Sequence, residues 1–169
     1  MTGPRATRPH MPGYGTLPAD QGSGLLPWSW AEKRLRASHD YWLATVWPDG
    51  RPHLMPVWAV WHDEALWFSS SKAARKVHNL RANPAVMVST DDALNPVVVE
   101  GTAKVMRDTV SRQAFLDAVN EKYRTGYRLD FLDPEVNATV RVRPRWVFGL
   151  DERDFGGSPT RWDFTADRR

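Results

Sequence analysis

Residues 41–61 read YWLATVWPDGRPHLMPVWAVW, and this stretch decides the fold class. The aromatic and β-branched run over 41–47 predicts a strand that is buried on both faces. The Pro-Asp-Gly sequence at 48–50 reverses the chain, and residues 53–61 supply the partner strand. Because Pro56 has no N–H to donate to a neighbouring strand, we expect an edge, a bulge or a place left open for a ligand at that position.

The rest of the chain repeats this pattern of strands joined by short turns. Further strands are predicted over 65–69, 85–90, 97–106 and 139–148, with a short edge segment over 160–164. The alternation of apolar and polar residues from 99 to 105 predicts that one face of its strand is wet. Some six strands, with one helix inserted after the third, favour a mainly β fold, an antiparallel barrel with inserted α-helices, over a parallel βαβ sheet.

Three helices are predicted around these strands. Ser29 and Glu32 have the spacing of a capping box and start a short helix before the first strand. Ser71 is expected to cap the helix after the third strand, and the Asn-Pro pair at 83–84 ends it. A third helix is predicted over about 109–123.

The 169 residues are enough to bury one core and divide into a body with two flanking segments. Residues 1–26 are rich in Pro and Gly and are predicted to form a flexible N-terminal arm. Residues 27–150 form the barrel domain. Residues 151–169 are predicted to form a tail that packs on the barrel or on a partner subunit.

Composition excludes several classes of protein. The chain has no cysteine, which removes disulfide frameworks, thiol nucleophiles and iron–sulfur clusters. The 23 basic and 20 acidic residues nearly balance, without the runs of like charge typical of nucleic-acid-binding proteins. The apolar runs fall far short of the roughly 20 residues of a membrane-spanning helix, and the N-terminus lacks an apolar signal core. We therefore expect a cytoplasmic protein with no nucleic-acid or membrane partner.

Residues 69–80, SSSKAARKVHNL, carry the sharpest functional signal. Three serines end a strand, and the backbone N–H groups of residues 72–74, which are expected to open a helix, would point at an anion. The spacing of the cations and the asparagine puts them on one helix face. The expected anion-binding residues are Ser69, Ser70, Ser71, Lys72, Arg75, Lys76 and Asn79. The alternative is a solvated amphipathic helix whose cations only keep it soluble.

Other chemical motifs are missing from the sequence. The five histidines show no metal-ligand spacing, and there is no Gly-x-Ser-x-Gly motif, so we predict neither a metal site nor a hydrolase triad. Trp58, Trp61 and Trp67 lie on the strands next to the predicted anion site. They form either an aromatic wall or part of the core.

Short matches to a known family run in a fixed order from Tyr41 to Asp108. They are Ala44-Thr45, Asp49-Gly50-Arg51-Pro52, Pro56-Val57-Trp58, Leu66-Trp67-Phe68-Ser69, Arg75-Lys76 with Asn79-Leu80, Asn83-Pro84, and Val98-Val99-Glu100-Gly101-Thr102-Ala103. On these residues the chain resembles the pyridoxamine 5'-phosphate oxidase-like split-barrel oxidoreductases, which use flavin or deazaflavin. The segments 143–148 and 160–164 also resemble a branch in which many members use the deazaflavin coenzyme F-420 instead of FMN.

The resemblance implies a six-stranded antiparallel split β-barrel of the FMN-binding type. It also implies a homodimer, with the coenzyme ring in a cleft at the subunit interface. Pro56, Val57 and Trp58 would lie along the ring, and the predicted anion-binding residues would hold the phosphate end. The basic positions and the C-terminal segment that bind the substrate phosphate of the true pyridoxamine 5'-phosphate oxidase are not found, so we do not expect that reaction.

The family chemistry needs no catalytic triad, because hydride transfer takes place at the coenzyme's own ring. No catalytic residue is assigned, and the proton donor stays open among Tyr41, His53 and water. In the last strand Arg141, Arg143 and Arg145 alternate with a face that holds Val140, Val142, Trp146 and Phe148. This arginine row either meets the acidic tail of F-420 or is only a wet strand face.

Three related functions are therefore kept open. The first is a reductase that uses F-420 to transfer hydride to a planar conjugated or quinone-like small molecule. The second is an FMN-dependent oxidoreductase of the same fold. The third is a non-catalytic protein that binds a flavin or haem.

Overall fold

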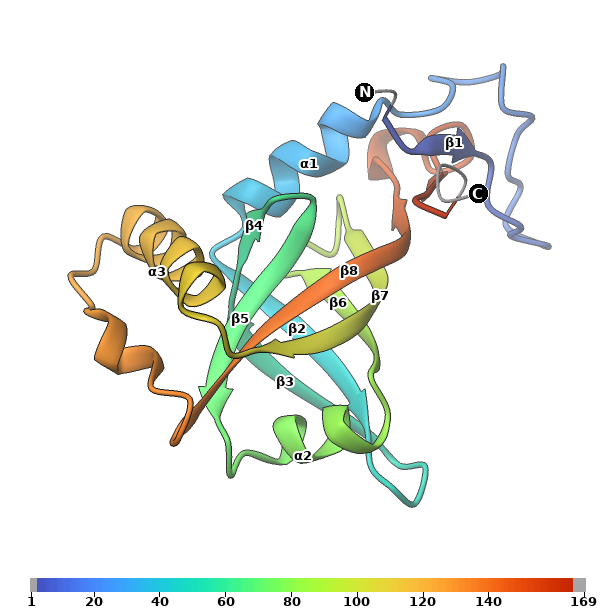
Figure 1. The fold of residues 1–169 in the computed structure, drawn as a ribbon. Coiled ribbons are helices and arrows are strands. Elements are labelled where there is room, and N and C mark those ends of the chain that lie inside the picture. Colours follow the sequence, from blue (N-terminus) through green and yellow to red (C-terminus); the bar gives the residue numbers. More distant parts are fainter. Residues whose placement is uncertain (1–2, 166–169) are drawn as a thin grey trace.

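Nine strands form one antiparallel sheet in the computed structural model, which describes residues 3–165 (Figure 1). The strands are β1 (Arg5–Thr7), β2 (Asp40–Val46), β3 (Pro52–Trp58), β4 (Val60–His62), β5 (Ala65–Ser71), β6 (Ala85–Thr90), β7 (Val97–Met106), β8 (Asn137–Gly149) and β9 (Thr160–Asp163). The helices are α1 (Trp28–Ala37), α2 (Arg75–Ala82) and α3 (Thr109–Tyr123), with short 3-10 turns η1 (Leu129–Leu132) and η2 (Glu152–Asp154).

The sheet curls into a barrel that stays open on one side. Its hydrogen-bonded order is β1-β9-β8-β7-β6-β2-β3, and β5 pairs with β8 and β4 off this path. β3 and β5 lie in contact, yet no ladder joins them in the described sheet. The predicted mainly β, antiparallel barrel is confirmed, and the opening between β3 and β5 splits it.

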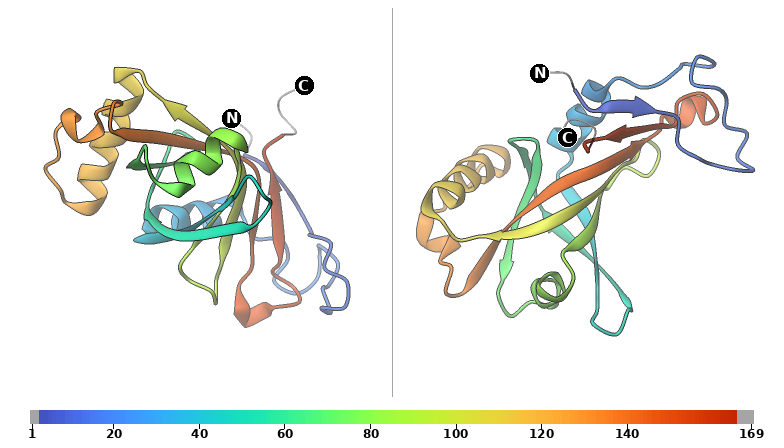
Figure 2. Two further views of the ribbon diagram at one scale, coloured as in Figure 1. Left: turned by 90° about the horizontal axis from the view of Figure 1, so that it is seen from below. Right: turned by 45° about the vertical axis from the view of Figure 1, so that its right-hand side comes forward.

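The three helices cover different parts of the barrel (Figures 1 and 2). α1 and α2 lie at opposite ends, and α3 packs outside against β4. The barrel interior is filled by apolar side chains such as Tyr41, Leu43 and Val99. A second cluster, including Trp67 and Phe115, lies between β5 and α3. α2 covers the end of the barrel opposite α1.

β2 is not buried on both faces, contrary to the prediction. Its residues alternate between the core and the surface, and Trp42 is 45% exposed. The neighbouring strands continue this outer face with Leu54 on β3, 56% exposed, and Met87 on β6, 40% exposed. Apolar residues on this outer face led to the prediction of an interior strand, although within residues 3–165 they stay exposed.

The predicted strand over 53–61 is interrupted at Ala59. Both polar groups of the Ala59 backbone are bound by the end of α3 instead of by a strand. The Ala59 N–H donates to the Tyr123 hydroxyl at 2.9 Å, and the Ala59 carbonyl accepts from Lys122 Nζ at 2.8 Å. The segment therefore divides into β3 and β4, and this break turns the chain from one side of the opening to the other.

β8 also departs from simple alternation, because the β7–β8 register shifts between Glu100 and Gly101. The extra residue opposite this step is Arg145. After it, Val147 is fully buried, whereas Trp146 and Phe148 are only partly buried. The prediction that Trp146 and Phe148 share the strand face of Val140 and Val142 is therefore wrong.

The two flanking segments meet each other. β1, within the N-terminal arm, pairs with β9 of the C-terminal tail, and β9 pairs with β8. α1 begins at Trp28 with Pro27 as its N-cap and no side-chain cap, so the predicted capping box at Ser29 is wrong. Within residues 3–165, no helix combines the length and the apolar character that a membrane span requires.

Candidate functional site

β3 forms one side of the opening in the barrel. It pairs only with β2 in the described sheet, so alternate backbone N–H and C=O groups on its other side have no strand partner. Pro56 thus lies on an edge strand, one of the settings predicted for it. Pro56 and Trp58 are exposed, whereas Val57 is partly buried and packs against the barrel core.

The chain between β5 and α2 does not form the predicted anion-binding turn. The Lys72 N–H donates to the Val136 carbonyl at 2.9 Å, and the Ala74 N–H to the Ser71 carbonyl at 3.0 Å. The Ala73 N–H donates to Ser71 Oγ at 3.2 Å. All three N–H groups are therefore occupied, and the prediction that they face an anion is wrong. Ser71 also does not cap α2, whose N-cap is Ala74.

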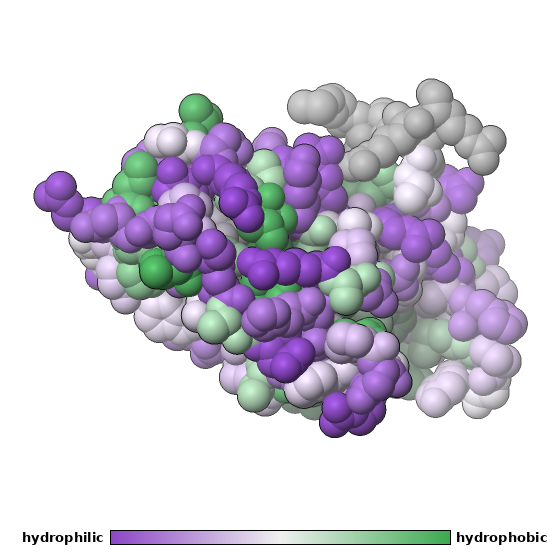
Figure 3. All heavy atoms as spheres, turned by 60° about the horizontal axis from the view of Figure 1, so that its bottom comes forward, coloured by the Kyte–Doolittle hydropathy of each residue, from purple (hydrophilic) through white to green (hydrophobic). Residues whose placement is uncertain are grey.

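Among the described residues, no hydrogen-bond acceptor is found for the N–H groups of Arg75 and Lys76, the first two residues of α2. The positive end of the helix dipole and two side-chain cations are brought together here. Arg75 is exposed, and Lys76 Nζ donates to Ser70 Oγ at 3.3 Å. Ser69 and Ser70 are partly buried and Ser71 is exposed at the end of β5. The face seen in Figure 3, with the α2 end of the barrel turned forward, is largely hydrophilic with small apolar patches.

Trp47, which the sequence analysis did not single out, organises the cations at this end. The guanidinium carbon of Arg75 lies 4.0 Å from the centroid of the Trp47 ring, and that of Arg51 lies 4.5 Å from it. Arg51 Nε also donates to Asp49 Oδ2 at 2.8 Å. The signal in the sequence was a tryptophan and an arginine on the two sides of the turn at 48–50.

Asn79 does not form an exposed basic face with Arg75, although it follows Arg75 by about one turn of α2. It is fully buried, and its Nδ2 donates to Thr45 Oγ1 at 3.0 Å. Thr45 Oγ1 lies 3.4 Å from His53 Nδ1. Asn79 therefore ties α2 to β2, and the predicted face of three cations and an amide is wrong.

Lys72 does not lie with the other two cations, Arg75 and Lys76. It lies before α2 and lines a small cavity with Arg81, Arg107 and Asn137, among others. This cavity is bordered by the ends of β7 and β8. The structure therefore brings Arg75 and Lys76 together at the start of α2 and leaves Lys72 outside that group.

Only one of the three flagged tryptophans remains available to a ligand. Trp61 and Trp67 are buried, which makes them core residues. Trp58 is 46% exposed, and its ring stacks on Tyr123 with centroids 4.3 Å apart and planes 4° apart. The His39 ring meets both in edge-on contacts. α3 thus supports one face of an exposed indole at the end of β3.

Tyr41 is excluded as the proton donor that the sequence left open. It is fully buried, its hydroxyl donates to the Leu35 carbonyl and accepts from Lys122 Nζ, and burial raises its pKa. Burial also raises the pKa of Tyr123 to about 12 and lowers that of Lys122 to about 8. His53 is partly buried beside Thr45 and remains a candidate donor.

These residues fit the anionic end of a coenzyme. Two cations, two open N–H groups and the serine hydroxyls are the donors that phosphate and carboxylate groups take. Asp49, in the hairpin turn next to Trp47, is already paired with Arg51. The open edge of β3 offers backbone donors and acceptors to a planar heterocycle beside it.

Comparisons with known proteins identify the family and the fold of the chain. The family described as pyridoxamine 5'-phosphate oxidase matches residues 31–150. A conserved hypothetical protein from Mycobacterium tuberculosis superposes with a TM-score of 0.68 at 24% identity, over 76% of this chain and 86% of that one. No curated protein gives a significant match.

Two further solved structures carry names that describe a ligand or an activity. An F-420 reductase is 29% identical, with a TM-score of 0.55 over 69% of this chain and 94% of that one. A FAD-binding protein from Mesorhizobium loti is 23% identical, with a TM-score of 0.58 over 80% of this chain and 93% of that one. The split-barrel fold is thus shared with proteins named for flavin and for deazaflavin.

Proposed function

Because the chain belongs to the pyridoxamine 5'-phosphate oxidase family, we propose that it is an oxidoreductase that binds the deazaflavin coenzyme F-420. The reaction is a hydride transfer to a planar conjugated or quinone-like small molecule, and the coenzyme supplies the hydride. The observation that carries the proposal is that two cations, Arg75 and Lys76, begin α2 and that β3 has an unpaired edge in the described sheet. The 29% identity to an F-420 reductase favours the deazaflavin over FMN.

Each part of the site has a role in this proposal. Arg75, Lys76 and the hydroxyl of Ser70 hold the anionic end by charge and hydrogen bonds. The unpaired edge of β3 binds the polar edge of the ring through its backbone groups. Trp58, supported by Tyr123, excludes water from the end of the cleft. His53 is the titratable side chain placed to move a proton near the α2 end.

A homodimer completes the site in this proposal. The outer face of β2, β3 and β6 exposes Trp42, Leu54 and Met87, whose partners across the strands lie on the same face. An adjoining groove of about 310 Å³ is lined mostly by small and apolar residues. Exposed apolar area of this kind marks an interaction surface. A second copy of the chain would bury this face and close the cleft over the edge of β3.

The test is a parallel titration of the purified protein with F-420 and with FMN, followed by quenching of tryptophan fluorescence. We expect saturable binding of F-420 with one site per chain and much weaker binding of FMN. Reduced F-420 is then mixed anaerobically with a quinone, and its oxidation is followed with and without the protein.

Each outcome of this test has a definite meaning. Tight binding of FMN alone would replace the proposal by an FMN-dependent oxidoreductase. Binding of F-420 without accelerated oxidation by any of a panel of quinones and conjugated alkenes would indicate a non-catalytic binding protein. Binding of neither coenzyme would leave α2 as a solvated helix and contradict the proposal.

A further inference from the structure

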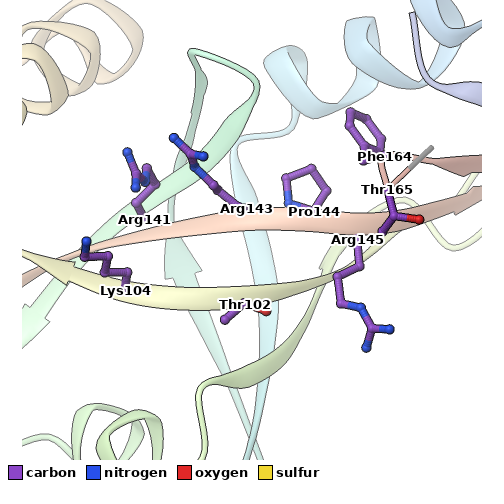
Figure 4. Close-up of a pocket in the computed structure, with 8 residues that line it drawn as sticks. All are labelled: Thr102, Lys104, Arg141, Arg143, Pro144, Arg145, Phe164 and Thr165. Atoms are coloured by element: carbon purple, nitrogen blue, oxygen red, sulfur yellow. The ribbon is translucent and has the colours of Figure 1, made fainter. Parts of the chain in front are cut away.

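A second group of cations lies on the outer face of β7 and β8, away from α2. The groove there has a volume of about 270 Å³ (Figure 4). Its lining residues are Thr102, Lys104, Arg141, Arg143, Pro144, Arg145, Phe164 and Thr165. None of them belongs to the site at the start of α2. We call this surface the β7–β8 groove.

The pairing of β7 with β8 brings the cations of the β7–β8 groove together. Lys104 on β7 is directly opposite Arg141 on β8, and Thr102 is opposite Arg143. Figure 4 shows Arg141 and Arg143 leaving β8 on the same side, whereas Arg145, at the bulge, turns the other way. Like charges directly across two strands destabilise a sheet unless another group compensates them.

Within residues 3–165, no acidic side chain lies in the groove to compensate the repulsion between these cations. The groove is lined by four cations and no acid, and only Arg145 has an acidic partner, Glu100 at 3.4 Å. Some cations elsewhere on the surface do have an acidic partner: Arg36 pairs with Glu32, Arg51 with Asp49, and Arg153 with Asp151. Lys104, Arg141 and Arg143 form no ion pair with any described residue.

The side chain of Arg141 provides an independent observation that points to a ligand. Its Nε is buried and has no hydrogen-bond partner in the described chain. Its guanidinium carbon lies 5.6 Å from the centroid of the buried Trp67 ring, which restrains the side chain. A buried guanidinium donor left without an acceptor is unfavourable, and an oxyanion would provide the acceptor.

We propose that the β7–β8 groove binds a small multivalent oxyanion, through phosphate or carboxylate groups. Arg141 and Arg143 offer planar forks that match either group, and Lys104 adds a third positive charge. The volume of the groove, about 270 Å³, suits a small molecule. Phe164 and Pro144 at the same groove supply apolar contact for a carbon skeleton attached to the anion. None of the residues that line the groove is among those at the start of α2, so binding at the groove can be tested apart from the coenzyme site.

The experiment measures binding of pyrophosphate and of citrate by isothermal titration calorimetry at constant ionic strength. It uses the Arg75→Ala/Lys76→Ala double variant, so that the site on α2 does not contribute. We expect one anion per chain, with chloride at the same ionic strength unable to compete. The tighter of the two anions identifies whether phosphate or carboxylate is preferred.

Two further variants in the same background locate the site. Arg143→Ala and Lys104→Ala, both at exposed positions, are each expected to weaken binding about tenfold or more. Arg128→Ala removes an exposed arginine outside the groove and is expected to change nothing. The proposal is overturned if neither anion binds, or if Arg128→Ala weakens binding as much as Arg143→Ala does. Thermal unfolding confirms that each variant is folded.

Discussion

The guanidinium of Arg75 lies over the ring of Trp47, with 4.0 Å between the guanidinium carbon and the ring centroid. Trp47 belongs to the hairpin between β2 and β3, and Arg75 is the first residue of α2. The contact therefore joins the two elements at the α2 end of the barrel opening. It holds an exposed cation in one direction, which lowers the entropic cost of binding an anion there.

Trp47→Leu is expected to weaken coenzyme binding about 3- to 5-fold, although Trp47 carries no charge. The reason is that Arg75 loses the aromatic surface that orients it. The measurement is the fluorescence titration with F-420. Trp146→Leu is the matched control, because it removes a tryptophan that lies 4.9 Å from the guanidinium of Arg161. An equal loss of affinity in both variants would contradict this role of Trp47.

Met87→Glu is expected to convert the proposed homodimer into a monomer. It puts a charge at an exposed apolar position on the proposed interface, where burial of an unpaired carboxylate is unfavourable. Sedimentation velocity measures the change in mass. Val110→Glu, at an exposed position on α3, should leave the dimer intact. A monomeric wild-type protein, or a Met87→Glu variant that still forms the dimer, would rule out this interface.

Lys122 is expected to make stability rise with pH above about pH 8. Burial lowers its pKa from 10.5 to about 8, although Asp40 and Asp91 act to raise it. Between these two values the unfolded chain binds a proton that the folded chain has lost, so the free energy of unfolding increases with pH. Tyr41 and Tyr123, whose pKa values are raised in the folded chain, lower the free energy of unfolding with increasing pH. This effect begins only above about pH 10, where the tyrosines ionise in the unfolded chain.

Urea unfolding between about pH 7.5 and 9.5 tests this behaviour in the wild-type protein and in Lys122→Met. The difference in the free energy of unfolding between the wild type and the variant should shift in favour of the wild type as the pH rises. The reason is that only the wild type carries the titrating lysine. Parallel pH profiles for the two proteins would show that Lys122 has an ordinary pKa.

Asn79 and Thr45 are expected to stabilise the protein as a pair. Their side chains are both buried and share a hydrogen bond of 3.0 Å between α2 and β2. Asn79→Ala should cost about 1–3 kcal/mol, because it leaves a buried hydroxyl with one partner fewer. A double-mutant cycle with Thr45→Val should give a coupling of about 0.5–1.5 kcal/mol. Additive effects would mean that the hydrogen bond contributes nothing.

Local patterns were sufficient for much of the fold. The predicted strands over 85–90 and 97–106 and the helix over 109–123 agree with β6, β7 and α3. Their signals are alternation, turn residues and a capping aspartate, Asp108, which accepts from the Ser111 N–H. Each signal acts within a few residues, which is why one sequence is enough to find it.

The errors arise where distant residues decide the structure. The Lys72 N–H donates to the Val136 carbonyl, and the Ala59 N–H donates to Tyr123 on α3. Because these partners are distant in sequence, local patterns predict neither the start of α2 nor the break after β3. The bulge at Arg145 depends on the partner strand β7. For the candidate site, the sequence pointed to Arg75 and Lys76, whereas the contact between Trp47 and Arg75 arises only through the fold.

The central claim is that the start of α2 holds the anionic end of the coenzyme. The most direct measurement compares the F-420 affinity of the wild type with that of Arg75→Ala/Lys76→Ala and of the control Lys33→Ala/Arg128→Ala, which removes an equal charge at exposed positions elsewhere. The account predicts a loss of about 100-fold or more in the α2 variant, from two charge-assisted contacts, and little change in the control. An unchanged affinity in a folded α2 variant would contradict it.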